Sequence, residues 1–287
     1  MAKILDGKIV RDFIARKLKR KISRLKKKPR LMIIQVGKRK ESSAYIRQKK
    51  LFGQKIGALV SHEEYPEKVA EKKLIAEILK WNRDKTIHGI IVQFPLPAHL
   101  SKSRLLEAVD PRKDVDGMTA KNLKGLWIGD RNSLMPATTK GILALFDYYK
   151  IPVMGKKVVV VGRSLLVGKP VAMAFTNRHA TVATVCHSRT KNLEEVTKKA
   201  DILVVAVGKI KLITKKHVSA GQVIIDVGIN MTSDKKLTGD VDFENVKKIV
   251  RAITPVPGGI GPMTVASLFE NLLLAYESQN HKKIKRK

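Results

Sequence analysis

The sequence predicts an α/β fold built from two α/β domains that flank a cleft. The chain has 287 residues, of which 44% are hydrophobic, enough for two cores of ordinary size. Apolar runs alternate with amphipathic segments in both halves, as in mostly parallel sheets covered by helices. A stretch rich in proline and glycine, residues 95–136, separates the halves, and we expect loops there and a domain boundary near Thr138.

The first half begins with a predicted amphipathic helix over residues 9–25, whose outer face is basic. Such a helix could lie on a membrane surface, but it leads into an apolar run at 31–36, so packing on a sheet is favoured. We expect strands at 31–36 and 89–94 and a short one around Leu59. Helices are expected at 69–81 and from Ser42 or Ser43, either of which could cap it, to about residue 56.

The second half contains a regular β/α series. Strands are expected at residues 157–161, 181–185, 202–207 and 223–227, with helices between them and a final helix from about 263 to 276. This order is typical of the Rossmann fold, which binds dinucleotides.

Charge leaves two classes of function open. There are 58 Lys and Arg against 25 Asp and Glu, a net charge of +33 that attracts polyanions. The basic residues are spread over most predicted helices, with denser runs only at 26–28 and 282–287, and no aromatic stacking motif lies among them. Non-specific adhesion to RNA is therefore expected, whereas specific nucleic-acid recognition is not.

Cysteine count and hydropathy exclude further classes. The single cysteine, Cys186, forms neither an intrachain disulfide nor a structural zinc site, and we expect no metal. No window approaches the roughly 18 to 20 apolar residues of a membrane span, and the N-terminus lacks a secretory apolar run. We expect a cytoplasmic protein.

A glycine turn follows the strand at 157–161 and forms a candidate phosphate site. Gly162-Arg163-Ser164 ends the strand, and Gly168 and Pro170 open the next helix, whose free N–H groups can meet a phosphate. The spacing departs from the usual G-x-G-x-x-G, so the turn alone is weak evidence.

The end of the next strand favours NADP over NAD. In NAD sites an Asp or Glu here binds the ribose 2′-hydroxyl. This chain has Cys186-His187-Ser188-Arg189-Thr190, without a carboxylate. Arg163 or Arg189 can pair with a 2′-phosphate through two N–H donors.

Candidate substrate residues lie in the first half. Tyr45 and Lys49 are four apart and share a helix face. Gln93 follows an apolar strand, at the edge where ligands gather in α/β sheets. Asp114 and Asp116 belong either to a ligand site or to an ordinary Asp-Gly turn.

These motifs, taken with PVPGGIGPMT at 255–264, resemble the bifunctional methylenetetrahydrofolate dehydrogenase/methenyltetrahydrofolate cyclohydrolase family. The likeness runs from Leu5-Asp6-Gly7 to the last helix, through SAY at 43–45, VQFP at 92–95, KDVDG at 113–117, GRS at 162–164, HSRT at 187–190, DVGIN at 226–230 and GDV at 239–241.

The resemblance implies oxidation of 5,10-methylenetetrahydrofolate by NADP⁺ and hydrolysis of the methenyl product to 10-formyltetrahydrofolate. It implies a folate-binding domain (1–138), an NADP-binding Rossmann domain (139–262), a helix at 263–280 that packs back on the first domain, and a homodimer. The basic surface would draw in a polyglutamate tail on the folate.

Roles of single residues also come from the resemblance. It makes Lys49 the acid/base group, with Gln93 as its hydrogen-bond partner, and Tyr45 a wall of the folate cleft. Asp116 holds the amino edge of the pterin, and these four form the catalytic set. Further substrate contacts are expected at Val92, Pro257, Gly258 and Gly259, and cofactor contacts at Gly162, Arg163, Ser164, Ser188, Arg189, Ile229 and Thr138.

One departure and two alternatives accompany this interpretation. Thr139 stands where the family is expected to have proline, which would loosen the turn into the second domain. The alternatives are a monofunctional NAD(P)-dependent methylenetetrahydrofolate dehydrogenase and a non-catalytic nucleic-acid-binding protein on a Rossmann scaffold.

Overall fold

The computed structural model describes residues 1–281, so the basic run at 282–287 lies outside the described part of the chain. Contacts divide the chain into two compact units. Unit 1 comprises Met1–Asp12 and Thr138–Thr264, and unit 2 comprises Phe13–Ala137 and the residues from Val265 on. The sequence assigned residues 1–138 to one domain, whereas residues 1–12 here group with unit 1, where Lys3 and Ile4 form a strand that pairs with Ala252 and Ile253.

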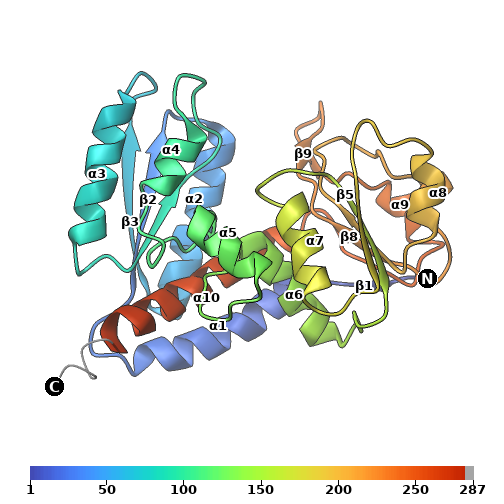
Figure 1. The fold of residues 1–287 in the computed structure, drawn as a ribbon, viewed down its shortest axis with the longest axis horizontal. Helices are drawn as coiled ribbons and strands as arrows, with labels where there is room; N and C mark the ends of the chain where they lie inside the picture. Colours follow the sequence, from blue (N-terminus) through green and yellow to red (C-terminus); the bar gives the residue numbers. More distant parts are fainter. Residues whose placement is uncertain (282–287) are drawn as a thin grey trace. The chain divides into compact units, whose positions relative to one another are not determined.

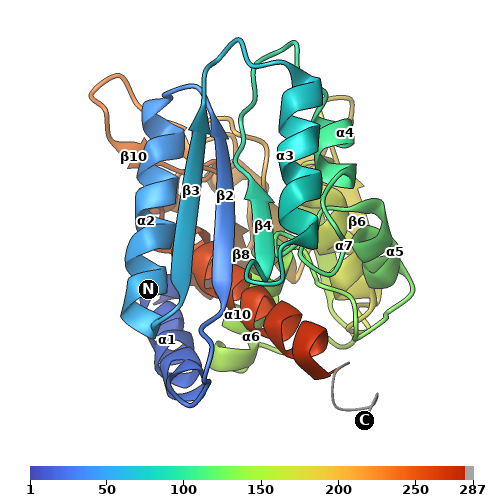
Figure 2. The ribbon, with the colours of Figure 1, turned by 90° about the vertical axis from the view of Figure 1, so that its left-hand side faces the viewer.

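Unit 2 is built on a parallel three-stranded sheet in the order β3-β2-β4. Helices α2 and α3 cover its opposite faces (Figures 1 and 2). The central strand is buried from Leu31 to Val36, as its largely apolar sequence predicts, and the burial includes the polar Gln35. Its elements are β2 (Arg30–Val36), α2 (Lys40–Ile56), β3 (Leu59–Tyr65), α3 (Glu71–Arg83), β4 (Gly89–Val92), α4 (Lys102–Glu107) and α5 (Ala120–Trp127).

Unit 1 contains a six-stranded sheet in the order β1-β11-β8-β7-β5-β6, all of its pairs parallel. Its strands are β1 (Lys3–Ile4), β5 (Lys157–Val161), β6 (Val182–Cys186), β7 (Ile202–Val205), β8 (Val223–Asp226) and β11 (Ala252–Ile253). A hairpin of β9 (Asn230–Met231) and β10 (Leu237–Thr238) stands apart from this sheet. The short helices are α7 (Gly168–Thr176), α8 (Leu193–Lys198), η1 (Lys215–His217) and α9 (Phe243–Val246).

Three helices run across the division of the chain: α1 (Gly7–Ser23), α6 (Ala137–Tyr149) and α10 (Ile260–His281). Within unit 2, Asn271 of α10 donates hydrogen bonds to the carbonyls of Val115 (2.9 Å) and Met135 (2.8 Å). The Lys28 ammonium donates to three carbonyls at the end of α1, so one lysine of the run at 26–28 is a helix cap. No helix in the described residues is both long and apolar enough to cross a membrane.

Several local expectations were wrong. Ser42 and Ser43 do not cap α2, which begins at Lys40 after Arg39; the Ser43 hydroxyl instead donates back to the Arg39 carbonyl at 3.1 Å. The expected loop region at 95–136 contains α4 and α5, and β3 is a full seven-residue strand. Thr139 lies inside α6 and not in a turn.

Candidate active site

Helix α2 presents Tyr45 and Lys49 on one face, as their spacing predicts. Tyr45 is half-buried, and Lys49 is only 8% exposed. A lysine this deeply buried contrasts with Lys50, its exposed neighbour, which contacts His62 at 3.1 Å. Burial therefore separates Lys49 from the surface lysines.

Lys49 is joined to Gln93 by a direct hydrogen bond. Its Nζ donates to Oε1 of Gln93 at 2.7 Å, while Nε2 of Gln93 donates to the Phe94 carbonyl at 2.8 Å. The second bond orients the amide so that its oxygen faces the lysine. The side chain of Val92, just before Gln93, belongs to the hydrophobic core, so a ligand can meet only the backbone there.

The electrostatics of this cluster favour neutral forms. Burial lowers the pKa of Lys49, and the negative charge of Asp116 opposes that shift. Burial also raises the pKa of Asp116, with Lys49 opposing and Asp114 reinforcing the shift. Because each charge acts on the other, Lys49 and Asp116 form one electrostatic unit. A lowered pKa favours the neutral amine, which is the form that accepts a proton.

In the segment KDVDG at 113–117, two polar side chains hold the local structure and one is available to a ligand. Lys113 donates to the carbonyls of Trp81 (2.9 Å) and Asp84 (2.6 Å) at the end of α3. Asp114 is buried and accepts from the Thr119 amide at 2.7 Å and from Asn122. No hydrogen bond within the described residues engages the Asp116 carboxylate, which leaves Asp116 as the acid available to a ligand.

In unit 1, the turn after β5 has the close backbone packing that a dinucleotide site requires. A Cβ on Gly162, whose φ is 131°, would lie 2.3 Å from the Ala206 carbonyl oxygen, and one on Gly168 would lie 2.0 Å from the Gly162 oxygen. Neither position accepts a side chain. Arg163 and Ser164 are exposed on the turn, and α7 begins at Gly168, as predicted.

The turn after β6 lies at the same edge of the sheet, since Val161 pairs with Cys186 and the Gly162 amide donates to the Cys186 carbonyl at 2.9 Å. His187 and Thr190 close this turn through a 2.9 Å bond from the His187 amide to the Thr190 hydroxyl. Ser188 and Arg189 remain exposed. The arrangement places hydroxyl and guanidinium donors beside the phosphate turn and suits the 2′-phosphate of NADP.

The remaining predicted residues of unit 1 lie in two further loops and in the first turn of α6. Ile229 is exposed in the loop after β8, and the Thr138 hydroxyl accepts a hydrogen bond from that of Thr264 at 3.2 Å. Pro257, Gly258 and Gly259 precede α10. The Gly7 amide donates to the Gly258 carbonyl at 2.9 Å, and a Cβ on Gly7 would lie 1.9 Å from the Gly259 oxygen, which explains the early Asp-Gly motif.

Sequence reasoning gave no role to two buried acids of unit 1, Asp226 and Asp240. Burial and the nearby Asp240 raise the pKa of Asp226 to about 7, against three backbone N–H groups that lower it. The available sequence signal was an Asp at the end of an apolar strand, with glycines nearby. The described residues contain no group of three or more His, Cys, Asp or Glu that could hold a metal.

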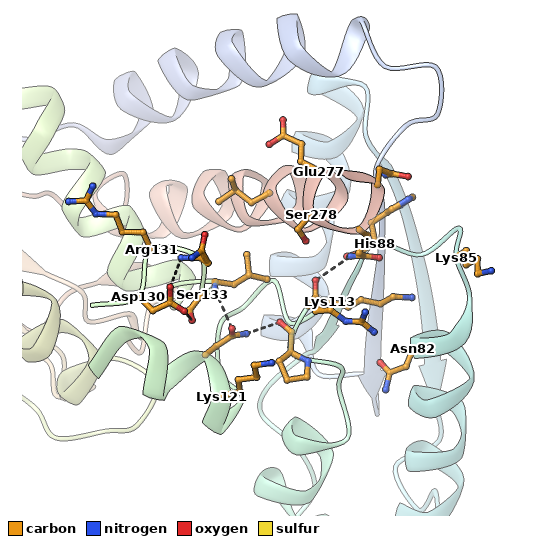
Figure 3. A pocket seen from close by; sticks show the side chains of 18 of the residues that line it. Asn82, Lys85, His88, Lys113, Lys121, Asp130, Arg131, Ser133, Glu277 and Ser278 are labelled. Atoms are coloured by element: carbon orange, nitrogen blue, oxygen red, sulfur yellow. Dashed lines mark hydrogen bonds between the residues drawn. The ribbon is translucent and has the colours of Figure 1, made fainter. Parts of the chain in front are cut away.

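A pocket of about 1100 Å³ in unit 2 contains none of the predicted site residues (Figure 3). Its wall includes His88, which comes just before β4, whereas Gln93 follows the other end of that strand. Six of its 19 lining residues are Lys or Arg, a modest excess in a chain with 58 in 287. The pocket is not our candidate for catalysis.

Comparison with known proteins decides the family. Residues 5–116 match the family described as tetrahydrofolate dehydrogenase/cyclohydrolase, catalytic domain, and residues 136–280 match its NAD(P)-binding domain. The chain belongs to the tetrahydrofolate dehydrogenase/cyclohydrolase family. It is 45% identical to the bifunctional protein FolD of Streptococcus thermophilus, over 94% of this chain and 96% of the relative. This membership confirms the α/β fold and sets aside the non-catalytic nucleic-acid alternative.

Solved structures agree with this family assignment. The bifunctional FolD of Campylobacter jejuni has a TM-score of 0.95 and 38% identity, covering 97% of this chain and 99% of its own. The FolD of Trypanosoma brucei, solved with NADP cofactor and an inhibitor, has a TM-score of 0.92 and 34% identity, covering 96% and 98% of the two chains.

Proposed function

We propose that this enzyme of one-carbon folate metabolism oxidises 5,10-methylenetetrahydrofolate with NADP⁺ and hydrolyses the methenyl product to 10-formyltetrahydrofolate. The observation that carries the second activity is the buried Lys49, hydrogen-bonded to Gln93 and electrostatically coupled to Asp116. Hydride transfer from the methylene group releases no proton, whereas the addition of water does, so a proton acceptor such as Lys49 serves the hydrolysis. This cluster therefore supports the bifunctional enzyme over the monofunctional alternative.

Unit 1 is assigned to NADP and unit 2 to folate chemistry. The crowded glycines at 162 and 168, with Arg163, Ser164, Ser188 and Arg189 exposed beside them, fit a dinucleotide carrying a 2′-phosphate. When bound, NADP⁺ supplies the acceptor for the hydride that leaves the folate methylene group. We also assign Thr138 and Ile229 to the cofactor.

In the hydrolysis, water adds to the methenyl carbon and loses one proton to a base. The bond from that carbon to N5 then breaks: N5 takes the remaining hydroxyl proton and the formyl group stays on N10, so one proton is released overall. Lys49, as the neutral amine, takes the proton of the attacking water. Gln93 fixes the direction of the ammonium that results. Lys49 thereby acts on the water and not on the hydride.

Recognition of the folate is assigned first to two residues of unit 2, Asp116 and Tyr45. Asp116 is an acceptor-only carboxylate when ionised and matches the N–H donors of a pterin edge. Tyr45 supplies a half-buried aromatic wall next to Lys49. We also propose substrate contacts at the backbone of Val92 and, separately, at Pro257, Gly258 and Gly259.

Three finer features accompany the proposal. The net charge of +33 would attract a polyglutamate tail on the folate, an effect that salt must weaken. We assign the enzyme to the cytoplasm, consistent with its single buried cysteine. We also assign it as a homodimer, which light scattering of the purified protein would test.

The proposal is tested by assaying the two reactions separately. NADPH formation from methylenetetrahydrofolate measures the first, and decay of added methenyltetrahydrofolate without cofactor measures the second. Lys49→Met should reduce the second by about a hundredfold or more, in line with the usual contribution of a general base. Lys50→Ala, on the same helix, is the matched control and should leave both rates unchanged. Wild-type hydrolysis by Lys49→Met would refute the assignment.

A further inference from the structure

Two buried carboxylates lie together beyond the end of β8. Asp226 is the last residue of that strand and is 3% exposed, and Asp240, just after β10, is 0% exposed. A Cβ on Gly228 would lie 2.2 Å from the Asp240 carboxyl carbon, and one on Gly239 would lie 1.9 Å from an Asp226 oxygen. The backbone closes around both acids only because these positions are glycine.

Asp240 accepts four hydrogen bonds from two loops. Its Oδ2 accepts from the amides of Val207 (2.7 Å) and Gly208 (3.0 Å), and its Oδ1 from the amide of Lys209 (2.8 Å) and Nδ2 of Asn230 (2.9 Å). Three consecutive amides directed at one carboxylate fix the loop that follows β7. The fourth bond ties that loop to the segment after β8.

Asp226 fixes Asp240 in turn. Its Oδ1 accepts from the amides of Gly228 (2.9 Å) and Asp240 (3.1 Å), and its Oδ2 from the amide of Val241 (2.9 Å). The acids thus form a relay: Asp226 holds the backbone on either side of residue 240, and Asp240 holds the two loops.

Both loops lie at the carboxyl edge of the sheet, next to the phosphate turn. The Ala206 amide donates to the Val161 carbonyl, and the Val227 amide donates to the Val205 carbonyl, each at 2.8 Å. Gly162 is in direct backbone contact with Ala206, where a Cβ would lie 2.3 Å from the carbonyl oxygen. Ligands of open α/β sheets bind at this edge. Ile229, the proposed cofactor contact, lies between Gly228 and Asn230, both of which are tied to the acids.

We propose that Asp240 is a positioning residue for NADP, acting through the loop at 206–209 and through Asn230 without touching the cofactor. The inference rests on the proposed function of unit 1. A carboxylate is required because only an ionised acid offers acceptors to all four N–H donors. An asparagine would direct an NH₂ group at some of those amides and displace the loop.

The test is Asp240→Asn, with the dissociation constant of NADPH measured by its fluorescence and the hydrolysis of methenyltetrahydrofolate measured without cofactor. We expect the dissociation constant to rise about ten- to a hundredfold, as for lost charge-assisted hydrogen bonds. The KM for NADP⁺ should rise with it. The KM for folate and the hydrolysis rate should change less than about twofold, because Asp240 holds loops of the unit assigned to NADP. Asp234→Asn, an exposed acid of the same segment, is the matched control and should bind NADPH normally.

The remaining outcomes are also decisive. Normal NADPH binding by Asp240→Asn would overturn the proposal. If Asp240→Asn also loses hydrolysis, it has lost its fold, and the test passes to Asn230→Ala, which removes only one of the four donors. A severalfold weaker NADPH affinity of Asn230→Ala with normal hydrolysis supports the proposal, and an unchanged affinity overturns it. Failure of the wild-type protein to bind NADPH would refute the proposed function itself.

Discussion

The ammonium of Lys49 donates a 2.7 Å hydrogen bond to the side-chain oxygen of Gln93, which the Phe94 carbonyl holds in place. This bond stabilises the charged form of a lysine whose pKa is lowered by burial. We therefore expect Gln93 to adjust the pKa of Lys49 as well as the direction of its side chain.

A pH profile of the hydrolysis tests this relationship. The rate should rise with pH through the pKa of Lys49, which lies below the ordinary 10.5, because only the neutral amine accepts a proton. Gln93→Met removes the acceptor that favours the ammonium, so the rising limb should move to lower pH. Gln54→Met, an exposed position of α2, is the control and should leave the limb in place. A limb that moves to higher pH, or stays in Gln93→Met, would contradict the role of Gln93.

The two acids of KDVDG should give opposite phenotypes. Asp116→Asn should raise the KM for folate by about ten- to a hundredfold, the usual effect of a lost charged hydrogen bond, with little change in melting temperature. Asp114→Asn should instead cost about 1–3 kcal/mol of folding stability, because a buried acceptor of Thr119 and Asn122 is mismatched. Steady-state kinetics and thermal melting of both variants check this, and exchanged phenotypes would show that the assignments are reversed.

Cofactor choice should depend on Arg189. Its exposed guanidinium follows β6, where no carboxylate is available for a ribose hydroxyl. Arg189→Ala should raise the KM for NADP⁺ by about tenfold or more while leaving that for NAD⁺ unchanged, since only NADP⁺ has the 2′-phosphate. Lys191→Ala removes a nearby exposed charge and serves as the control. Equal losses with both cofactors would place Arg189 away from the 2′-phosphate.

Thr139 offers a stabilising substitution. It is the third residue of α6, and its buried hydroxyl has no hydrogen-bond partner among the described residues. An amide in the first helical turn has no partner within the helix, so proline is tolerated there. Thr139→Pro should raise the free energy of unfolding by about 1 kcal/mol, because proline lowers the conformational entropy of the unfolded chain. Thr139→Val removes only the hydroxyl, so it separates the effect of the unpaired hydroxyl from the effect of proline on the backbone. A lower melting temperature for the proline variant would contradict this account.

The predictable part of the fold was the part encoded in local patterns. Largely apolar runs marked β2, β5, β7 and β8, because strands buried on both faces carry few polar side chains. Gly162 and Gly168 were informative because only glycine fits such turns. In unit 2 the expected hydrogen bond between Lys49 and Gln93 is present, although the two residues lie 44 positions apart in sequence.

The missed features depend on tertiary contacts. Helix α5 is only eight residues long, and its Asn122 is held by Asp114, which no local pattern reveals. Strands β1 and β11 have two residues each and exist through pairing across the whole chain. The interaction between Asp226 and Asp240 likewise requires the loops to be folded.

The most direct test of the bifunctional account is one reaction, followed by two signals. Purified enzyme is given methylenetetrahydrofolate and NADP⁺, with NAD⁺ in a parallel sample, and NADPH and the methenyl intermediate are measured together. We predict NADPH formation with NADP⁺ and no accumulation of the methenyl species. Accumulation of the methenyl species in step with NADPH would show that the enzyme is a dehydrogenase that does not hydrolyse its product. That result would contradict the central role given to Lys49.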